Sequence, residues 1–521
     1  MAELETRRDG ISSRWLALAA LTLALVAIGL DQTVLNLALP TLSKSLGASE
    51  SQLQWFVTAY TLALAAAMLP AGLLGDRYGR KTVLLGALAV FGVMSVACAY
   101  APNPNAFIAA RTVLGIAGAA LTVMSLSVVT VLFSEAERPR AMGIWAAGNF
   151  LALPLGPIVG GYVLAHFWWG WVFLMNVPVV LIGLTAAAVF VPQSRSERRP
   201  SIDILGVLLS STGLALLMYG LVEAGDNGWG SASAIVPSIV GMATLTIFVL
   251  WEAWLTARPN GQPLVDLGLF RSRSFSVGVV LAAAGIFGMF GVLFLLPQYL
   301  QAIRGVNAQG AGLRFLPTIA GLVVGAIPAD RVAARIGSRV TVALGFGILT
   351  VGMVAGSAMT TSTGDGYIAA YTFVVGAGAG LGLATAASAA IVELSVERSG
   401  VGSALLQAII KLGPAFGATI LGSVLNSTYQ SQVSVTGLPS AAAAAVQQSV
   451  FGGLAVAQQL GSTGLAESVR TAFVAGMDDA SRVAAVIAAV GMVGALILLP
   501  RRSSAAAEAA DKLAERAVVS G

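Results

Sequence analysis

The chain is poor in the residues that metal sites, disulfides and soluble surfaces require. Among 521 residues it has one cysteine, Cys98, one histidine, His166, and only 10% charged residues. A single cysteine cannot form an intramolecular disulfide, and together with one histidine it cannot build a zinc or cluster site. Soluble domains carry about 25% charged residues. We therefore expect neither a soluble protein nor an enzyme, and no cofactor.

Apolar residues dominate instead, at 57% of the chain. They form continuous runs of about 20 residues, the length that crosses a bilayer core as a helix. The first run is too long for a signal-peptide core and lacks a small-residue cleavage site, so we interpret it as a retained span. The prediction is an all-α polytopic membrane protein with fourteen spans. Their approximate positions are 15–38, 52–75, 82–101, 106–132, 140–164, 171–191, 204–224, 234–256, 275–300, 311–329, 340–359, 367–394, 402–425 and 482–500.

The positive charges lie mainly on one side of these spans. Two of the 29 lysines and arginines, Arg111 and Lys411, fall within spans. Five more fall in connectors opposite the termini, which leaves 22 on the side of the termini. These five are Lys44, Arg304, Arg314, Arg470 and Arg482. By the positive-inside rule both termini are cytosolic. The net charge of +5 thus sets orientation, and we expect no nucleic-acid partner.

A weak internal repeat indicates two related lobes. Residues 77–81 (RYGRK) end the second span, and 335–339 (RIGSR) follow the tenth in the same style. Such repeats are typical of transporters built from two halves. We predict a six-helix lobe at 1–192 and a linker with an inserted helix pair at 193–258. A second six-helix lobe follows at 259–500, with a long outer loop at 427–480, and a cytosolic tail at 501–521.

The loop between the second and third spans is the most informative motif. Residues 72–81 read GLLGDRYGRK, a dense group of charge and glycine between two apolar runs. This composition predicts a tight cytosolic hairpin.

Two charges lie inside the first lobe. Asp31 is about 15 residues, or about 22 Å, into the first span, where a carboxylate must be paired, hydrated or protonated. It is a candidate proton carrier, or else a structural hydrogen-bonding group. Arg111 opens the sequence RTVLGIAGAA in the fourth span and lies in the same half of the membrane. It either pairs with Asp31 or snorkels to the surface.

The fifth span contains glycines and prolines between 148 and 161. Proline kinks a helix, and glycine allows a neighbouring helix to approach. The segment is therefore a packed kink, a pivot for lobe movement, or both. The candidates are Gly156, Pro157, Gly160 and Gly161.

These stretches, in this order, resemble the motifs of the major facilitator superfamily. Residues 30–40 (LDQTVLNLALP) are similar to the first-helix signature of its fourteen-span drug:proton antiporter family (DHA2), and 148–161 resembles its antiporter motif. Further similarity lies at 169–178, 297–301 and 398–403. The resemblance covers almost the whole chain.

The resemblance implies a proton-coupled exporter of small amphiphilic compounds in the inner membrane of a bacterium, acting by alternating access. Protons are the coupling ion, lipid surrounds the protein, and we expect a functional monomer. Asp31 and Arg111 would couple protons. A second set would control the conformational change: the fifth-span candidates above and, in the loop, Gly72, Asp76, Arg77, Gly79 and Arg80.

The chain departs from the cation exporters of this family, which carry further acids within the membrane. At the matching places it has Thr58 and Lys411. Lys411 is either part of a structural pair or lies on the cavity wall with Gln407, one turn earlier. In the second case it would favour neutral, zwitterionic or anionic substrates. The other candidate cavity residues are Tyr60, Glu223 and Phe290, each with packing or an interfacial position as the alternative.

Two other functions remain open at this point. The same cycle can move a lipid or an endogenous metabolite, and the same fold can serve as a membrane sensor that transports nothing.

Overall fold

Every regular element that the structure describes is a helix. The computed structural model describes residues 2–133, 137, 141, 144, 155–194, 203–258, 261, 263–392 and 405–500. Eleven of the described helices are long and apolar enough to cross a membrane, or twelve if the bent pair Ala308–Ala326 and Ala329–Ile336 is one span. The predicted all-helical polytopic fold is confirmed. The number fourteen stays a prediction. The helices that correspond to the predicted spans 52–75 and 140–164 are not among the eleven that are long and apolar enough.

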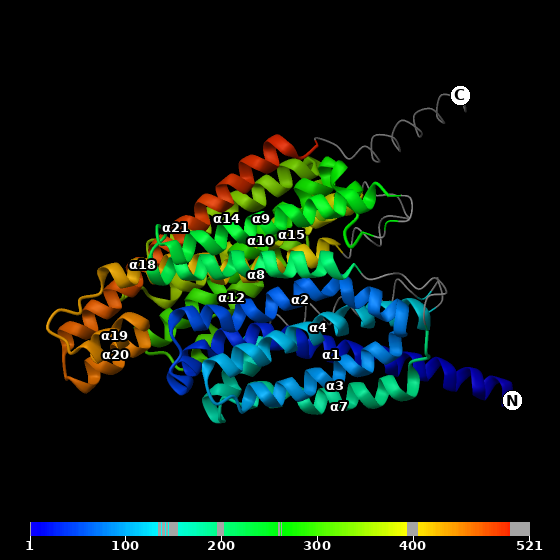
Figure 1. Cartoon of the computed structure of the whole chain (residues 1–521), viewed down its shortest axis with the longest axis horizontal. Coiled ribbons are helices and arrows are strands. Elements are labelled where there is room, and N and C mark those ends of the chain that lie inside the picture. The colour runs from blue at the N-terminus through cyan, green and yellow to red at the C-terminus, as the bar shows by residue number, and fades with distance from the viewer. Residues whose placement is uncertain are drawn as a thin grey trace.

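The first lobe is drawn from blue to cyan-green in Figure 1. Within it α2 packs along α4, and α3 packs along α4 and α7. Its helices are α1 (Ala2–Leu46), α2 (Glu50–Tyr78), α3 (Arg80–Ala99), α4 (Pro104–Leu132), Leu155–His166, α6 (Trp171–Leu174) and α7 (Asn176–Phe190).

The inserted pair consists of α8 (Ile204–Asn227) and α9 (Ala232–Thr256). The two helices pack on each other, and α8 also contacts α2 of the first lobe and α18 of the second. Helix α8 therefore lies against both lobes.

The second lobe is held together by glycines in α15. A Cβ on Gly378 would lie 2.4 Å from the backbone nitrogen of Leu349 in α14, and one on Gly380 would lie 2.2 Å from the carbonyl oxygen of Leu322 in α12. Small residues thus let the backbones touch. The helices are α10 (Arg273–Gln298), α11 (Ala308–Leu313), α12 (Leu316–Ala326), α13 (Ala329–Ile336), α14 (Ser338–Gly356), α15 (Asp365–Val392), α17 (Leu412–Phe416), α18 (Gly422–Gln432) and α21 (Thr463–Leu498), with a 3₁₀ turn η1 (Leu267–Arg271) and two π segments, η2 (Tyr299–Ile303) and η3 (Gly417–Leu421).

The predicted outer loop 427–480 is too long at both ends. Helix α18 continues to Gln432 and α21 begins at Thr463, because a helix can run on past the apolar segment that hydropathy detects. Between them lie two short helices, α19 (Ser440–Gln448) and α20 (Val450–Gln459). The Lys44 ammonium lies 5.4 Å from the ring centre of Phe451, so α20 also reaches the first lobe.

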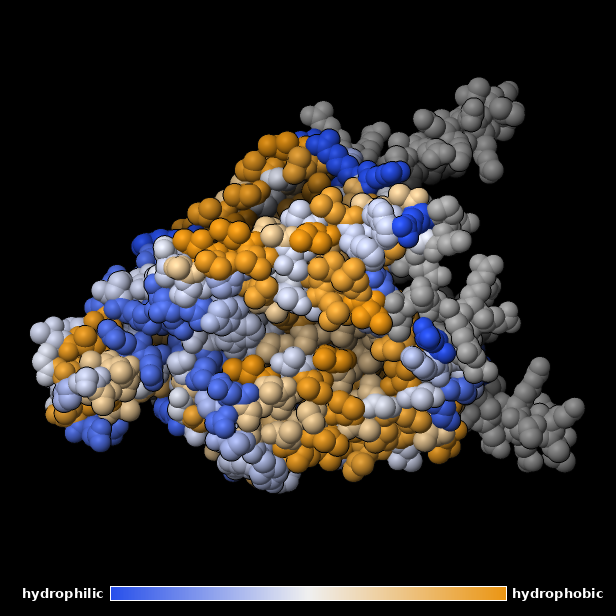
Figure 2. Space-filling model, viewed as in Figure 1, coloured by the Kyte–Doolittle hydropathy of each residue, from blue (hydrophilic) through white to orange (hydrophobic). Residues whose placement is uncertain are grey.

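The molecule has two distinct ends, seen in Figure 1. We call the end with the first residues of α1 and the last residues of α21 the inner end, and the end with α19 and α20 the outer end. Figure 2 shows apolar residues over much of the lobes between these ends, and hydrophilic ones toward both ends. Exposed apolar side chains such as Val93 and Val351 fit a surface that faces lipid.

Hydrogen bonds between the described parts of the two lobes lie toward the outer end. Thr58 in α2 and Thr419 in η3 share one at 2.8 Å. Three more link the outer parts of the lobes: Gln298 to Glu50, Gln301 to the Leu37 carbonyl, and Ser423 to Gln54. The outer end is closed in this conformation.

Candidate functional site

Asp31 and Arg111 form a buried ion pair in the first lobe. Arg111 donates through Nη1 to Asp31 Oδ2, and the side chains of Arg111 and Asp31 are 1% and 0% exposed. Its Nε also donates to the Phe56 carbonyl at 3.3 Å, and the guanidinium lies 4.1 Å from the ring centre of Tyr60. The predicted pairing is therefore present. Snorkelling of Arg111 to the surface is wrong for this conformation.

Glycines in α4 place Tyr60 against this pair. A Cβ on Gly115 would lie 2.3 Å from the Tyr60 carbonyl oxygen, and one on Gly118 would lie 3.1 Å from the Tyr60 hydroxyl. The close approach of α2 and α4 buries Tyr60 completely. The predicted position of Tyr60 on a cavity wall is therefore corrected by the structure. Its ring lies inside the first lobe and covers Arg111.

The pair has unused hydrogen-bonding capacity. Asp31 Oδ1 and the Tyr60 hydroxyl are buried and make no hydrogen bond to the described residues. A buried ion pair gains its attraction against a large desolvation cost. A proton on Asp31 would compete with Arg111 for the carboxylate, while Arg111 would keep Phe56 and the face of Tyr60 as partners. The geometry thus allows an exchange between a charged pair and a protonated acid.

The glycines of the fifth span pack against α1 and the second lobe. A Cβ on Gly156 would lie 1.8 Å from Thr33 Oγ1, and one on Gly160 would lie 2.5 Å from Val34 Cγ1. Both targets are only two or three residues beyond Asp31. Gly161 faces the backbone of Gln309 in α11. The fifth-span segment therefore contacts both α1 and the second lobe. These contacts are compatible with both predicted roles, a packed kink and a pivot.

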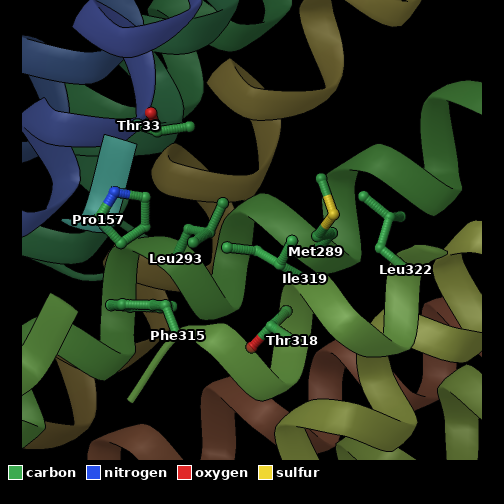
Figure 3. Close-up of a pocket in the computed structure, with 8 residues that line it drawn as sticks. All are labelled: Thr33, Pro157, Met289, Leu293, Phe315, Thr318, Ile319 and Leu322. Atoms are coloured by element: carbon green, nitrogen blue, oxygen red, sulfur yellow. The ribbon is translucent and has the colours of Figure 1, made fainter. Parts of the chain in front are cut away.

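An apolar pocket lies between the lobes beside this contact (Figure 3). Thr33 and Pro157 come from the first lobe, and the rest of the lining comes from α10 and the α11–α12 segment of the second. Thr318 Oγ1 is buried without a partner among the described residues. The remaining lining residues are Met289, Leu293, Phe315, Ile319 and Leu322. Of the whole set only Pro157 was predicted as a functional residue, because apolar residues in an apolar helix give no contrast that marks a cavity.

The structure separates the residues predicted to line a cavity. Lys411 is half-buried at a turn between helical residues 405–410 and α17, and Gln407 is exposed one turn earlier. Among the described residues, Lys411 Nζ has no ion-pair or hydrogen-bond partner. Phe290 is buried in α10, next to the pocket residue Met289. Glu223 lies at the outer end, where it accepts a hydrogen bond from Asn227 at 2.7 Å, and it does not line the pocket of Figure 3.

The loop at the inner end forms the predicted tight hairpin. Gly79 ends α2 and begins α3 with a φ of +106°, which favours glycine. Gly337 makes the same turn between α13 and α14 with a φ of +84°, so the internal repeat is visible in the backbone. The Arg80 amide donates to the Ser194 carbonyl at 2.8 Å, which ties the hairpin to the end of its own lobe.

The other loop residues have different surroundings. Arg77 is exposed and lies over the neighbouring Tyr78 ring, 5.7 Å from its centre. The side chain of Asp76 lies outside the described part of the chain. Gly75 is the close-packed glycine, with a notional Cβ 2.3 Å from Met124 Sδ, whereas one on Gly72 would meet Val123 at an ordinary 3.6 Å.

Two helical lobes closed at the outer end, a pocket between them and a buried ion pair are features of a secondary transporter. The sequence profile described as the Major Facilitator Superfamily matches residues 21–418. The chain belongs to this superfamily, and it is a secondary transporter rather than an enzyme.

Its relatives include several resistance and efflux proteins. It is 32% identical to the multidrug efflux pump LfrA of Mycolicibacterium smegmatis, over 92% of this chain and 95% of that protein. It is 29% identical to the tetracenomycin C resistance and export protein of Streptomyces glaucescens, over 94% and 93%. It is also 29% identical to the methyl viologen resistance protein SmvA of Salmonella typhimurium, over 81% and 84%. The predicted family is thus confirmed.

Solved structures share the fold. A bacterial homologue of the human lysosomal transporter Spinster, in an inward-facing and unoccupied conformation, superposes with a TM-score of 0.66 at 17% identity, over 94% of this chain and 98% of that one. A D-xylose–proton symporter gives 0.57 at 14% identity, over the same two shares.

Proposed function

We propose that this protein exports small amphiphilic compounds in exchange for protons across the cytoplasmic membrane of a bacterium. The observation that carries the proposal is the buried ion pair between Asp31 and Arg111. Asp31 stands two residues before Thr33, and Thr33 lines the pocket between the lobes. The relatives' roles in drug efflux support it. In this proposal the chain acts as a monomer with fourteen spans and both termini in the cytosol.

The proton step uses the exchange that the pair allows. A proton that reaches Asp31 neutralises the carboxylate and frees Arg111 from it. Thr33 and Val34 follow Asp31 on α1 and contact Gly156 and Gly160. A shift of α1 on protonation would therefore reach the fifth span and, through Gly161, the other lobe. Binding of substrate and of proton would then be coupled through one helix.

The uncharged pocket lining and, separately, the charge of Lys411 support one class of substrate. The pocket lining carries no charged residue, and the ammonium of Lys411 has no acid partner among the described residues. An uncompensated positive charge within a span disfavours multiply charged cations. We therefore infer neutral, zwitterionic or anionic amphiphiles as substrates.

A charge series at Lys411 tests this inference. Two unit charges about 8 Å apart repel by about 2 kcal/mol at an effective dielectric constant of about 20. Removal of this repulsion in the uncharged variant Lys411→Met should lower the half-saturating ethidium concentration about thirtyfold. Lys411→Asp replaces the repulsion with attraction and should lower that concentration further. Ethidium and methyl viologen efflux would be measured in cells that lack other pumps. Efficient viologen export by the wild type, with no gain in the Asp variant, would contradict the assignment.

A further inference from the structure

A second buried acid, Glu50, lies between the lobes at the outer end. It is the first residue of α2 and precedes the apolar segment 52–75, so it lies outside the part of the helix that crosses the membrane core. Its side chain is only 2% exposed. Gln298 Nε2 donates to Glu50 Oε1 at 3.1 Å, from the last residue of α10 in the other lobe. One hydrogen bond to a carboxyl group therefore joins the two lobes at this end.

The surroundings of Glu50 are acidic. Asp226 on α8 acts electrostatically on Glu50, and it accepts a hydrogen bond from Asn426 of α18 at 2.6 Å. Glu223 lies one turn earlier on α8. From α18, the Tyr429 hydroxyl also faces this region and donates to the Val446 carbonyl at 2.7 Å. Glu50 makes no ion pair with the described residues.

Most cations of the outer end are engaged elsewhere. Lys44 lies over the Phe451 ring, both Arg304 and Arg314 pair with Asp365, and Arg482 pairs with Asp479. The groups that shift the pKa of Glu50 include no cation, and Arg470 is not among them. Burial of a carboxyl group without a cation favours its protonated form. Burial raises the pKa of Glu50 to about 7, with a smaller contribution from Asp226 and an opposing one from the Gln298 hydrogen bond.

We propose that Glu50, Gln298 and Asp226 form a proton-sensitive latch that holds the outer ends of the two lobes together. A proton on Glu50 allows it to remain buried against Gln298. Loss of that proton leaves a buried carboxylate that is repelled by Asp226 and paired with no cation, which favours separation of the lobes. When the lobes separate, water reaches Glu50 from the outer side, and Glu50 therefore exchanges its proton with the solution on that side. The latch is thus distinct from Asp31 and does not depend on which compound is exported.

The direction of the pH effect follows from linkage. The closed form binds the proton more tightly, with a pKa of about 7 against an ordinary value of about 4.5 for a hydrated glutamate. The ratio of closed to open outer ends is therefore highest below about pH 4.5. It falls by up to about tenfold per pH unit as the pH rises toward about 7, and is constant above that.

Distance measurements on the purified full-length protein test the latch. Spin labels at Asn105→Cys and Ser362→Cys, in a Cys98→Ala background, report the separation of the lobes. Asn105 is exposed in the first turn of α4, and Ser362 is exposed in the connector between α14 and α15. The long-distance population should rise from pH 5 to pH 8 in the parent. In Glu50→Gln it should stay low and independent of pH. The control Glu467→Gln, an exposed acid on α21, should behave like the parent.

A second variant separates the hydrogen bond from the titration. Gln298→Met removes the donor and should raise the long-distance population at every pH, while the pH dependence remains. A pH response in Glu50→Gln equal to that of the parent would overturn the proposal, as would distances in the parent that do not change with pH. Neither result depends on drug efflux, so a failure of the latch and a failure of the export proposal remain distinguishable.

Discussion

At the scale of single residues, the chemistry is concentrated in a small group inside the first lobe. Arg111 is shared among Asp31, the Phe56 carbonyl and the ring of Tyr60. Loss of the Asp31 charge would leave Arg111 with two of these three partners. The group can therefore change its protonation state without leaving a bare buried cation, which is the most costly outcome of breaking a buried pair.

We expect Asp31→Asn to abolish proton-driven export while the fold is kept. Asparagine has nearly the same shape and can still accept a hydrogen bond from Arg111, but it cannot carry the proton. One proton moving inward supplies about 2.3 kcal/mol per 100 mV, more than a tenfold gradient of a neutral substrate. That accumulation should disappear in proteoliposomes, while downhill exchange, the internal control, continues. Uphill transport at the wild-type rate would exclude Asp31 as the proton carrier.

The sequence could predict the charged part of this site but not the rest. Asp31 and Arg111 stand out because charges inside apolar runs are rare. The prediction that Tyr60 lies on a cavity wall is wrong. The direction of its ring depends on how closely α2 and α4 approach each other, and this distance is set by Gly115 and cannot be predicted from the sequence. Glu50 was not predicted at all. An acid at the start of a helix is ordinary in sequence, and only the closed lobes make it buried.

At the scale of helices, irregular segments coincide with contacts between the lobes. Thr419 lies in the π segment η3, and Gln301 lies in the π segment η2. The segment η2 begins directly after Gln298. π segments turn side chains out of the regular helical register and are frequent at functional sites. Sequence periodicity could predict these spans, since α10 and 405–432 are continuous and apolar. It could not predict the π segments, because an extra residue in one turn leaves hydropathy unchanged.

Close helix packing gives a prediction at this scale. Gly115→Ala should destabilise the protein by about 1–3 kcal/mol, because the added Cβ would lie 2.3 Å from the Tyr60 carbonyl oxygen. The control is Gly86→Ala, where no atom lies within 4 Å of the added Cβ. Thermal unfolding of the two purified variants would show a lower midpoint for Gly115→Ala alone. Equal midpoints would mean that α2 and α4 are not in backbone contact here.

At the scale of the whole molecule, the two lobes differ at their inner hairpins. Gly79 and Gly337 make equivalent turns, but Asp76 stands three residues before the first and Ala334 three residues before the second. Only the first lobe has a carboxylate at that position. Arg77 is exposed in the present conformation, with the outer end closed. A loop that holds the inner ends together would be engaged only when the outer end opens.

This asymmetry leads to a prediction for Asp76→Ala. If Asp76 accepts charge-assisted hydrogen bonds when the inner ends meet, its loss should cost that state about 1.5–3 kcal/mol, or about tenfold or more in population. The same labels at Asn105 and Ser362 should then show a smaller long-distance population at every pH. The pH dependence set by Glu50 should remain, which distinguishes this variant from Glu50→Gln. The control Asp330→Ala removes an exposed inner-end acid from the other lobe and should leave the distances unchanged. An unchanged distribution in Asp76→Ala, with normal transport, would rule out the loop as an inner lock.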